Sequence, residues 1–242
     1  MIYFLVPMYN EESNLATLHQ NLTSAPIGGR QPFFVFSDDG SQDRSVELVQ
    51  ELFPESQSYV VGDGQNYGPG HAFDVGFEWI LQHSQSRDDI VVTMEADNTS
   101  DIGILPQMLT IYDTGFELVL ASVYIQSGGF GETTFFRKFI SFTGNMMLRL
   151  TLGIKVLTLS SFYRIYSLEL LRKIKAKNGQ LIAEPGFICM VEILHKAIRQ
   201  QASIIEVPMT LRSEARVGKS KMKIFKTTMS YLRFMGKNMF RK

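Results

Sequence analysis

Ile90-Val91-Val92-Thr93-Met94-Glu95-Ala96-Asp97 is the stretch that decides the fold. An apolar, β-branched run followed at once by an acidic triplet is typical of a buried β-strand with a polar end. Open α/β proteins bind their ligands beyond the carboxyl ends of parallel strands. The carboxylates of Glu95 and Asp97 therefore suit a hard divalent cation, Mg²⁺ or Mn²⁺, which in turn suits a diphosphate. Taken alone, a solvated strand end is the simpler alternative.

Apolar runs and helix-like segments alternate over the first 125 residues. We expect strands at 2–6, 33–37, 59–61, 90–94 and 118–122, and helices at 11–24, 44–53, 70–82 and 105–112. Strict alternation of strand and helix predicts a mostly parallel sheet with helices on its faces. The predicted fold class is therefore α/β, with a Rossmann-like central sheet.

The pattern changes after residue 124. A loop at 126–131 leads to a helix expected at 133–152, and a turn-rich pair of strands is expected around 156–166. Later helices are expected at 167–176 and 187–200, a strand at 204–208, and a basic, Met- and Phe-rich helix at 221–240. No linker divides the chain. We expect a single domain over 1–211, followed by a basic loop and an amphipathic C-terminal helix over 212–242.

The composition is that of an ordinary globular protein, with 45% hydrophobic and 20% charged residues in a chain of 242. The net charge of zero conceals an asymmetry, because residues 212–242 carry ten Lys/Arg and one acid, and the remainder carries −9. A basic end predicts an anionic partner. Cys189 is the only cysteine and lies in an apolar run, which predicts a buried thiol. Without an evident signal peptide or spanning segment, we expect a cytoplasmic protein.

Two further strand ends carry acidic and aromatic residues. The first is Pro7-Met8-Tyr9-Asn10-Glu11-Glu12, in which the ring of Tyr9 is suited to stack on a nucleotide base. A helix N-terminus with Asn10 as its cap is the alternative for the polar residues of this stretch. The second is Ser37-Asp38-Asp39-Gly40-Ser41-Gln42-Asp43, a turn with more acid than capping needs.

These motifs together resemble the family 2 glycosyltransferases of the GT-A fold, and within them the dolichyl-phosphate mannosyltransferase and polyprenyl-phosphate glycosyltransferase group. The three acidic strand ends and the turn Asn66-Tyr67-Gly68-Pro69-Gly70 occur in the family's order and spacing. The resemblance implies roles for particular residues. Those expected to line the base and ribose pocket of a nucleotide sugar are Pro7, Tyr9, Glu11 and Asp39.

By the same resemblance, Glu95-Ala96-Asp97 corresponds to the family's Asp-x-Asp. It makes Asp97 the main metal ligand and a catalytic residue, with Glu95 as a second ligand. Ala96 would lie beside the donor. Here the first acid of the motif is glutamate, and its longer side chain would still reach a ribose or a metal-bound water.

Basic residues of the second half complete the resemblance. Arg137 matches the arginine that faces the diphosphate, and residues 158–164 resemble Asp-x-Thr-Ser-Gly-Phe-Arg, ending on Arg164. Residues 216–221 resemble the Arg-x-x-Gly-x-Ser-Lys loop, one residue shorter, and bring in Arg216 and Lys221. The resemblance makes Arg137, Arg164 and Lys221 catalytic, and Arg216 donor-binding. Glu192 matches a family glutamate, with an acid on a helix face as the alternative.

The function that the resemblance implies is inverting transfer of one sugar from a nucleotide sugar to a polyprenyl phosphate, in cell envelope biogenesis. A phosphate acceptor is already an anion, whereas a hydroxyl acceptor would need a carboxylate base. We expect the basic helix to lie at the inner face of the membrane, or a membrane-embedded partner to supply the lipid. A solvated helix face is the alternative.

Two rival functions stay open at this point. One is a GT-A transferase acting on a saccharide hydroxyl. The other is a non-catalytic GT-A subunit, which the departures Glu95, Val123, Thr158 and Phe162 motivate. A nucleic-acid partner is not expected, because the acidic strand ends would repel a phosphate backbone.

Overall fold

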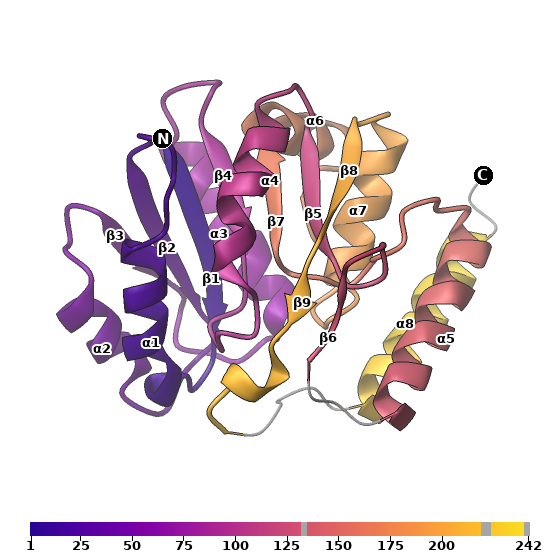
Figure 1. Ribbon diagram of the computed structural model, residues 1–242, viewed down its shortest axis with the longest axis horizontal. Coiled ribbons are helices and arrows are strands. Elements are labelled where there is room, and N and C mark those ends of the chain that lie inside the picture. Colours follow the sequence, from indigo (N-terminus) through magenta and orange to yellow (C-terminus); the bar gives the residue numbers. More distant parts are fainter. Residues whose placement is uncertain (132–134, 219–223, 240–242) are drawn as a thin grey trace.

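A seven-stranded sheet forms the centre of the molecule (Figure 1). The computed structural model describes residues 1–131, 135–218 and 224–239, and side chains outside 132–141, 219–226 and 238–242. The strands of the sheet are β1 (Ile2–Met8), β2 (Pro32–Asp38), β3 (Ser58–Val61), β4 (Ile90–Thr93), β5 (Leu118–Ser122), β7 (Arg164–Ser167) and β8 (Ile204–Pro208). Their spatial order is β3-β2-β1-β4-β7-β5-β8.

All neighbours in the sheet are parallel except β7, which runs antiparallel to β4 and β5. A second, two-stranded ladder pairs β6 (Gly129–Phe130) with β9 (Thr210–Leu211). Because β1, β2 and β4 are parallel neighbours, their carboxyl ends meet at one edge of the sheet. The three acidic loops predicted from the sequence follow these three strands.

Helices cover both faces of the sheet. On one face lie α1 (Glu12–Thr23), α2 (Ser45–Leu52) and α4 (Leu105–Tyr112), and on the other α3 (Pro69–His83), α6 (Leu168–Asn178) and α7 (Cys189–Arg199). Strand β1 shows the division, since Phe4 and Val6 enter the first core and Tyr3 and Leu5 the second. Burial on both sides explains why the strands are apolar throughout instead of alternating.

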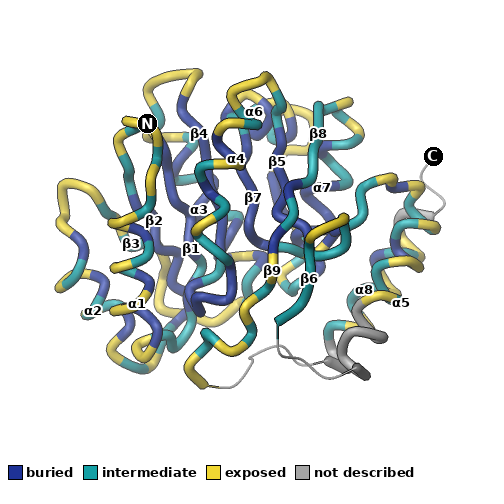
Figure 2. The backbone as a smooth tube through the Cα atoms, in the orientation of Figure 1, coloured by how far each residue is buried: buried dark blue, intermediate teal, exposed yellow. Residues whose placement is uncertain are grey.

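Helices α5 (Phe135–Leu152) and α8 (Ile224–Met239) pack against each other beside the main body (Figure 1). Figure 2 shows that their described surfaces are mostly half-buried or exposed, unlike the strands. Leu148 of α5 and Phe234 of α8 are buried and belong to the core on the α3 side. Leu152, Tyr231 and Met235 pack against the same core, so the pair is attached to the body on its α3 side.

The predicted α/β class and the predicted strands of the first 125 residues are confirmed, with ends that shift by at most two residues. The thiol of Cys189 is buried, as expected. The pair of strands predicted around 156–166 is wrong, because only Arg164–Ser167 forms a strand there. Residues 157–159 instead hydrogen-bond to the side chains of Asn145 and Glu206, which replaces a ladder partner.

Candidate active site

The loops after β1 and β2 are joined by hydrogen bonds from side chains. The side-chain oxygen of Asn10 accepts from the backbone N–H of Gln42 at 2.7 Å, and Ser41 Oγ accepts from the N–H of Asn10 at 2.9 Å. The N–H of Glu11 donates to Ser45 Oγ at 2.7 Å. Asn10 therefore ties the two loops together, and the alternative that it caps its own helix is wrong.

Asp39 supports the wall of the site between β2 and α3. Its buried carboxylate accepts the backbone N–H groups of Tyr67 at 2.8 Å and of Gly68 at 2.9 Å. Burial raises the pKa of Asp39, and the two N–H donors oppose that rise. Gly68 has a φ of +104°, and an added Cβ would lie 2.6 Å from the carbonyl oxygen of Pro185, so this turn requires glycine.

The acidic triplet after β4 places its two carboxylates at the predicted edge. Oδ1 of Asp97 accepts the N–H of Thr99 at 3.1 Å and its hydroxyl at 2.7 Å. Oδ2 of Asp97 accepts from Nε of Arg216 at 2.6 Å, and Nη2 of Arg216 pairs with the same oxygen. Glu95 is partly buried and accepts the hydroxyl of Ser100. The side chain of Ala96 is buried in the core, so only its backbone is left to face a ligand.

The electrostatics of the triplet favour a cation. Burial, and to a smaller extent the neighbouring charge of Asp97, raise the pKa of Glu95 to about 7. A divalent ion beside Glu95 would offset the repulsion that the charge of Asp97 exerts on it. No group of three or more His, Cys, Asp and Glu among the described residues forms a complete metal site. Two carboxylates completed by substrate phosphates are the arrangement that Mg²⁺ prefers, so Glu95 and Asp97 fit a cation that is shared with a diphosphate.

The segment before α8 crosses over the acidic triplet and is held there by its backbone. The N–H of Arg212 donates to the carbonyl of Thr99 at 3.0 Å, and the N–H of Val217 donates to Oδ1 of Asn14 at 3.0 Å. Asn14 is buried on α1 and also donates to Glu11 at 2.7 Å. Sequence reasoning missed Asn14. The sequence signal that could have identified it is a polar residue on the helix face that carries the apolar residues Leu15, Leu18 and Leu22.

Arg164 does not lie where the resemblance placed it. Its guanidinium is fully buried and donates to the carbonyls of Leu159 at 2.6 Å, Ser161 at 2.7 Å and Met190 at 2.9 Å. Another donor reaches the hydroxyl of Tyr166 at 3.1 Å. The structure thus corrects the expectation that Arg164 faces a phosphate. This arginine holds β7, the loop before it and the start of α7 together.

Thr158, which replaces an acid of the family motif, lies next to an acid from elsewhere in the chain. Its hydroxyl is 2.6 Å from that of Ser122, at the end of β5. The carboxylate of Glu206 in β8 accepts the N–H groups of Leu157 and Thr158, both at 2.8 Å. Glu206 thus brings a carboxylate to this loop. Sequence reasoning did not single it out, because it lies on a different strand far along the chain.

The remaining predicted residues are placed as follows. Pro7, Tyr9 and Glu11 are partly buried at and after the end of β1, and their contact with a nucleotide stays a prediction. The side chains of Arg137 and Lys221 lie outside the described residues.

Glu192, which matches a glutamate of the resembled family, is buried on α7. Its carboxylate accepts the N–H groups of Ala183 at 3.0 Å and Glu184 at 2.8 Å, and it pairs with Lys196 at 2.8 Å. It therefore fixes the loop 183–186 that packs against Gly68 and Gly70.

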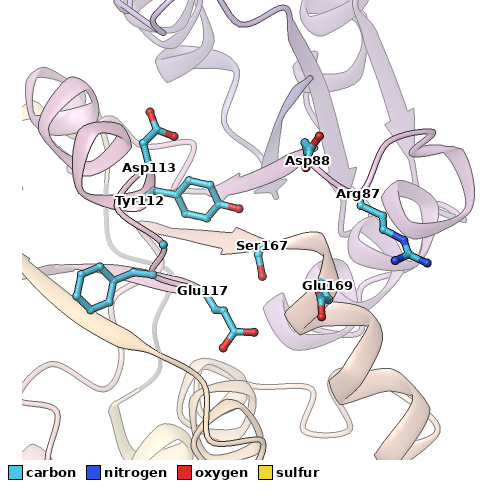
Figure 3. Close-up of a pocket in the computed structure, with 9 residues that line it drawn as sticks. Arg87, Asp88, Tyr112, Asp113, Glu117, Ser167 and Glu169 are labelled. Carbon is cyan, nitrogen blue, oxygen red and sulfur yellow. The ribbon is translucent and has the colours of Figure 1, made fainter.

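A pocket of about 240 Å³ lies at the opposite edge of the sheet (Figure 3). Asp88 and Glu117, which line it, precede β4 and β5, whereas the acidic triplet follows β4. None of the predicted site residues lines this pocket. The carboxyl edge of the parallel strands therefore remains the candidate active site.

Comparison with known proteins gives a consistent result. The family described as "Glycosyl transferase family 2" matches residues 3–175. The polyprenol monophosphomannose synthase of Mycolicibacterium smegmatis is 29% identical over 220 residues, which cover 90% of this chain and 79% of that protein. The dolichol-phosphate mannosyltransferase of Pyrococcus furiosus is 30% identical over 229 residues, 95% of this chain and 61% of that protein.

Among solved structures, glucosyl-3-phosphoglycerate synthase from Mycobacterium tuberculosis superimposes with a TM-score of 0.71 at 16% identity. The match covers 99% of this chain and 78% of that one. That crystal structure is a complex with Mn²⁺, uridine diphosphate and phosphoglyceric acid. At this level of identity the likeness establishes the fold.

Proposed function

The chain belongs to glycosyltransferase family 2 and has the GT-A fold, and from that premise we propose that it transfers one sugar, with inversion, from a nucleotide-sugar donor to a polyprenyl phosphate. The observation that carries the proposal is the pairing of Asp97 with Arg216. This contact joins the acidic end of β4 to the basic segment before α8. A carboxylate for a cation and an arginine for phosphate, side by side, suit the departure of a nucleoside diphosphate.

The proposed roles follow from charge. Pro7, Tyr9, Glu11 and Asp39 form the donor side of the site. Glu95 and Asp97 would hold a divalent cation, Mg²⁺ or Mn²⁺, which would supply electrostatic stabilisation of the leaving diphosphate. Arg216 binds phosphate oxygens once the donor is present, together with Arg137 and Lys221.

The acceptor phosphate is already an anion near neutral pH, so its oxygen attacks the anomeric carbon without a general base. Attack from the face opposite the leaving group inverts the configuration at that carbon.

A lipid phosphate acceptor has two supports. The relatives at 29% and 30% identity are named polyprenol monophosphomannose synthase and dolichol-phosphate mannosyltransferase. The tryptophan of the Gln-x-x-Arg-Trp motif of polysaccharide-forming branches also has no counterpart here. Trp79 is the only tryptophan, and it stacks with Phe33, Tyr59 and His83 on α3 and the neighbouring strands.

Two of the four departures that motivated a non-catalytic reading, Phe162 and Thr158, are accommodated by contacts within the fold. Phe162, in place of a glycine, is 8% exposed; its ring meets Phe73 edge-on at 4.9 Å and stacks on Phe187 at 5.9 Å. Thr158 is held by Ser122 and Glu206. Neither change alters the contact between Asp97 and Arg216, so both are compatible with an enzyme.

The lipid is reached, in this proposal, through α5 and α8 at the cytoplasmic membrane face. Their described parts expose large apolar side chains, with Leu150 77%, Phe142 54% and Leu232 48% exposed, and α8 also carries the exposed basic residues Arg233 and Lys237. Apolar bulk beside cations is the composition of a helix that lies in an anionic membrane interface. No helix within the described ranges has the length and hydropathy needed to cross a bilayer. Helices α5 and α8 would then serve attachment, whereas the segment before α8, which carries Arg216, would serve transfer together with residues 1–211.

Calorimetric titration with a panel of sugar nucleotides, with and without Mn²⁺, tests the donor site. We expect one donor to bind in a Mn²⁺-dependent way. Transfer of its labelled sugar to a polyprenyl phosphate in detergent, followed by chromatography of the lipid product, tests the acceptor. Transfer to a soluble saccharide in place of the lipid would favour the hydroxyl-acceptor reading. Absence of any donor binding would favour the non-catalytic subunit.

Co-sedimentation with vesicles tests the attachment surface. We expect Leu232→Glu to reduce binding to vesicles that contain anionic lipid, because it places a carboxylate in the apolar part of α8. Tyr59→Glu is the matched control, since Tyr59 is also 48% exposed but lies on edge strand β3. Equal binding of both variants and the unaltered chain would point to a membrane-embedded partner as the anchor.

A further inference from the structure

The carboxylate of Asp97, the predicted metal ligand, is already paired with a basic side chain, that of Arg216. Nε of Arg216 donates to Oδ2 of Asp97 at 2.6 Å, and Nη2 pairs with the same oxygen. The side chain of Asp97 is 12% exposed and that of Arg216 is 29% exposed, so the contact is largely withdrawn from water. A charge-assisted pair in such surroundings is stronger than one at the open surface.

The other oxygen of Asp97 is not free to take over. Oδ1 accepts both the N–H and the hydroxyl of Thr99. An incoming divalent ion must therefore compete with Arg216 for Oδ2. A displaced guanidinium would be left partly buried without its carboxylate, which is costly.

We propose that Arg216 guards Asp97 in the donor-free protein, so that the divalent cation binds tightly only together with a nucleoside diphosphate. The inference rests on the proposed function, because it takes Asp97 as the metal ligand. The diphosphate resolves the competition, since it brings anionic oxygens to which the forked guanidinium of Arg216 moves. Arg216 thereby exchanges one anionic partner for another while the cation takes Oδ2 of Asp97.

The neighbouring backbone limits this exchange to the side chain. Hydrogen bonds from Arg212 N–H to the carbonyl of Thr99 and from Val217 N–H to Asn14 hold the chain on both sides of Arg216. Rotation about the side-chain bonds of Arg216 is therefore sufficient to move its guanidinium from Asp97 to the diphosphate. The consequence is a binding order. The cation and the donor bind together, and the cation alone does not displace Arg216 from Asp97.

The chain offers a matched control for the experiment. Arg212 lies four residues earlier and pairs with Asp101 at 2.9 Å, so Arg212→Gln removes the same charge from the same segment without touching Asp97. Binding of Mn²⁺ alone to the full chain is measured by electron paramagnetic resonance of the free ion. We expect Arg216→Gln to bind Mn²⁺ about 10-fold more tightly than the unaltered protein. Arg212→Gln should bind as the unaltered protein does.

The second part of the experiment repeats the Mn²⁺ binding measurement in the presence of UDP or GDP. One of the two should raise the Mn²⁺ affinity of the unaltered protein about 10-fold, and that of Arg216→Gln much less. Asp97→Asn in the Arg216→Gln background should remove the tight binding, which assigns it to this site.

The two possible failures are distinguishable. If Arg216→Gln binds Mn²⁺ no more tightly than the unaltered protein or Arg212→Gln, the guarding role is refuted while nucleotide-dependent binding keeps the metal site. If no variant binds Mn²⁺ with or without nucleotide, the metal assignment of the proposed function fails, and the guarding role fails with it.

Discussion

Replacement of Arg164 by methionine tests whether this arginine supports the fold or binds phosphate. Methionine keeps most of the apolar stem and removes the guanidinium. The change leaves the carbonyls of Leu159, Ser161 and Met190 without the donors that they have now. All of them lie around a side chain that is fully buried.

The expected magnitude follows from those three acceptors. A buried group that loses its hydrogen-bond partner costs about 1–3 kcal/mol. Relief of the buried charge offsets part of this, because no carboxylate among the described residues forms an ion pair with Arg164. We expect a net loss of about 3–5 kcal/mol in the free energy of unfolding. In a chain of this size that corresponds to a fall in Tm of roughly 10 °C.

The assay combines thermal unfolding by circular dichroism with donor binding by calorimetry at 15 °C, where the variant is still folded. Arg172→Met is the control, since Arg172 is partly buried and makes one side-chain hydrogen bond, to Ser84 at 3.0 Å. Its loss should stay below about 1 kcal/mol. An unchanged Tm for Arg164→Met, together with donor affinity reduced about 100-fold, would refute the structural role and restore the phosphate-binding one.

Three further outcomes are expected. Asp97→Asn should abolish Mn²⁺-dependent donor binding in calorimetry and lower the free energy of unfolding by about 1–3 kcal/mol, because it leaves the partly buried guanidinium of Arg216 without its carboxylate; retained metal-dependent binding would exclude Asp97 as the ligand. Glu95 has its pKa raised from 4.5 to about 7, so the metal-free protein loses stability as pH rises through that interval. Glu95→Gln should therefore stabilise it by about 1–2 kcal/mol at pH 8 and by little at pH 5, and equal effects at both pH values in urea titrations would contradict the shift. Gly70→Ala should destabilise by about 2–4 kcal/mol, because its Cβ would lie 1.9 Å from the carbonyl oxygen of Glu184, whereas Gly144→Ala in α5 meets no atom within 4 Å and should stabilise by up to about 1 kcal/mol. Equal Tm values for the two glycine variants would show that the 183–186 loop yields freely.

The local pattern was sufficient for the first half of the fold. Strands of β-branched and aromatic residues and helices with polar outer faces alternate there, and each element is specified by residues close in sequence. The second half was harder to predict. Residues 157–159 read as a strand, but Glu206 and Asn145, which come from distant elements, take up their backbone groups.

The sequence by itself determined which residue types stand at the carboxyl ends of β1, β2 and β4, because strand ends are local features. Parallel topology then makes those ends neighbours, which the alternating pattern also predicts. Only the tertiary structure decided which basic side chains lie against these strand ends. Arg216 reaches Asp97 across 119 positions of the chain, whereas Arg164, in register with a family motif, turns inward to carbonyls of the loop before β7 and of α7. The direction of a long side chain depends on the partners that the fold brings within its reach, and motif spacing carries no information about them.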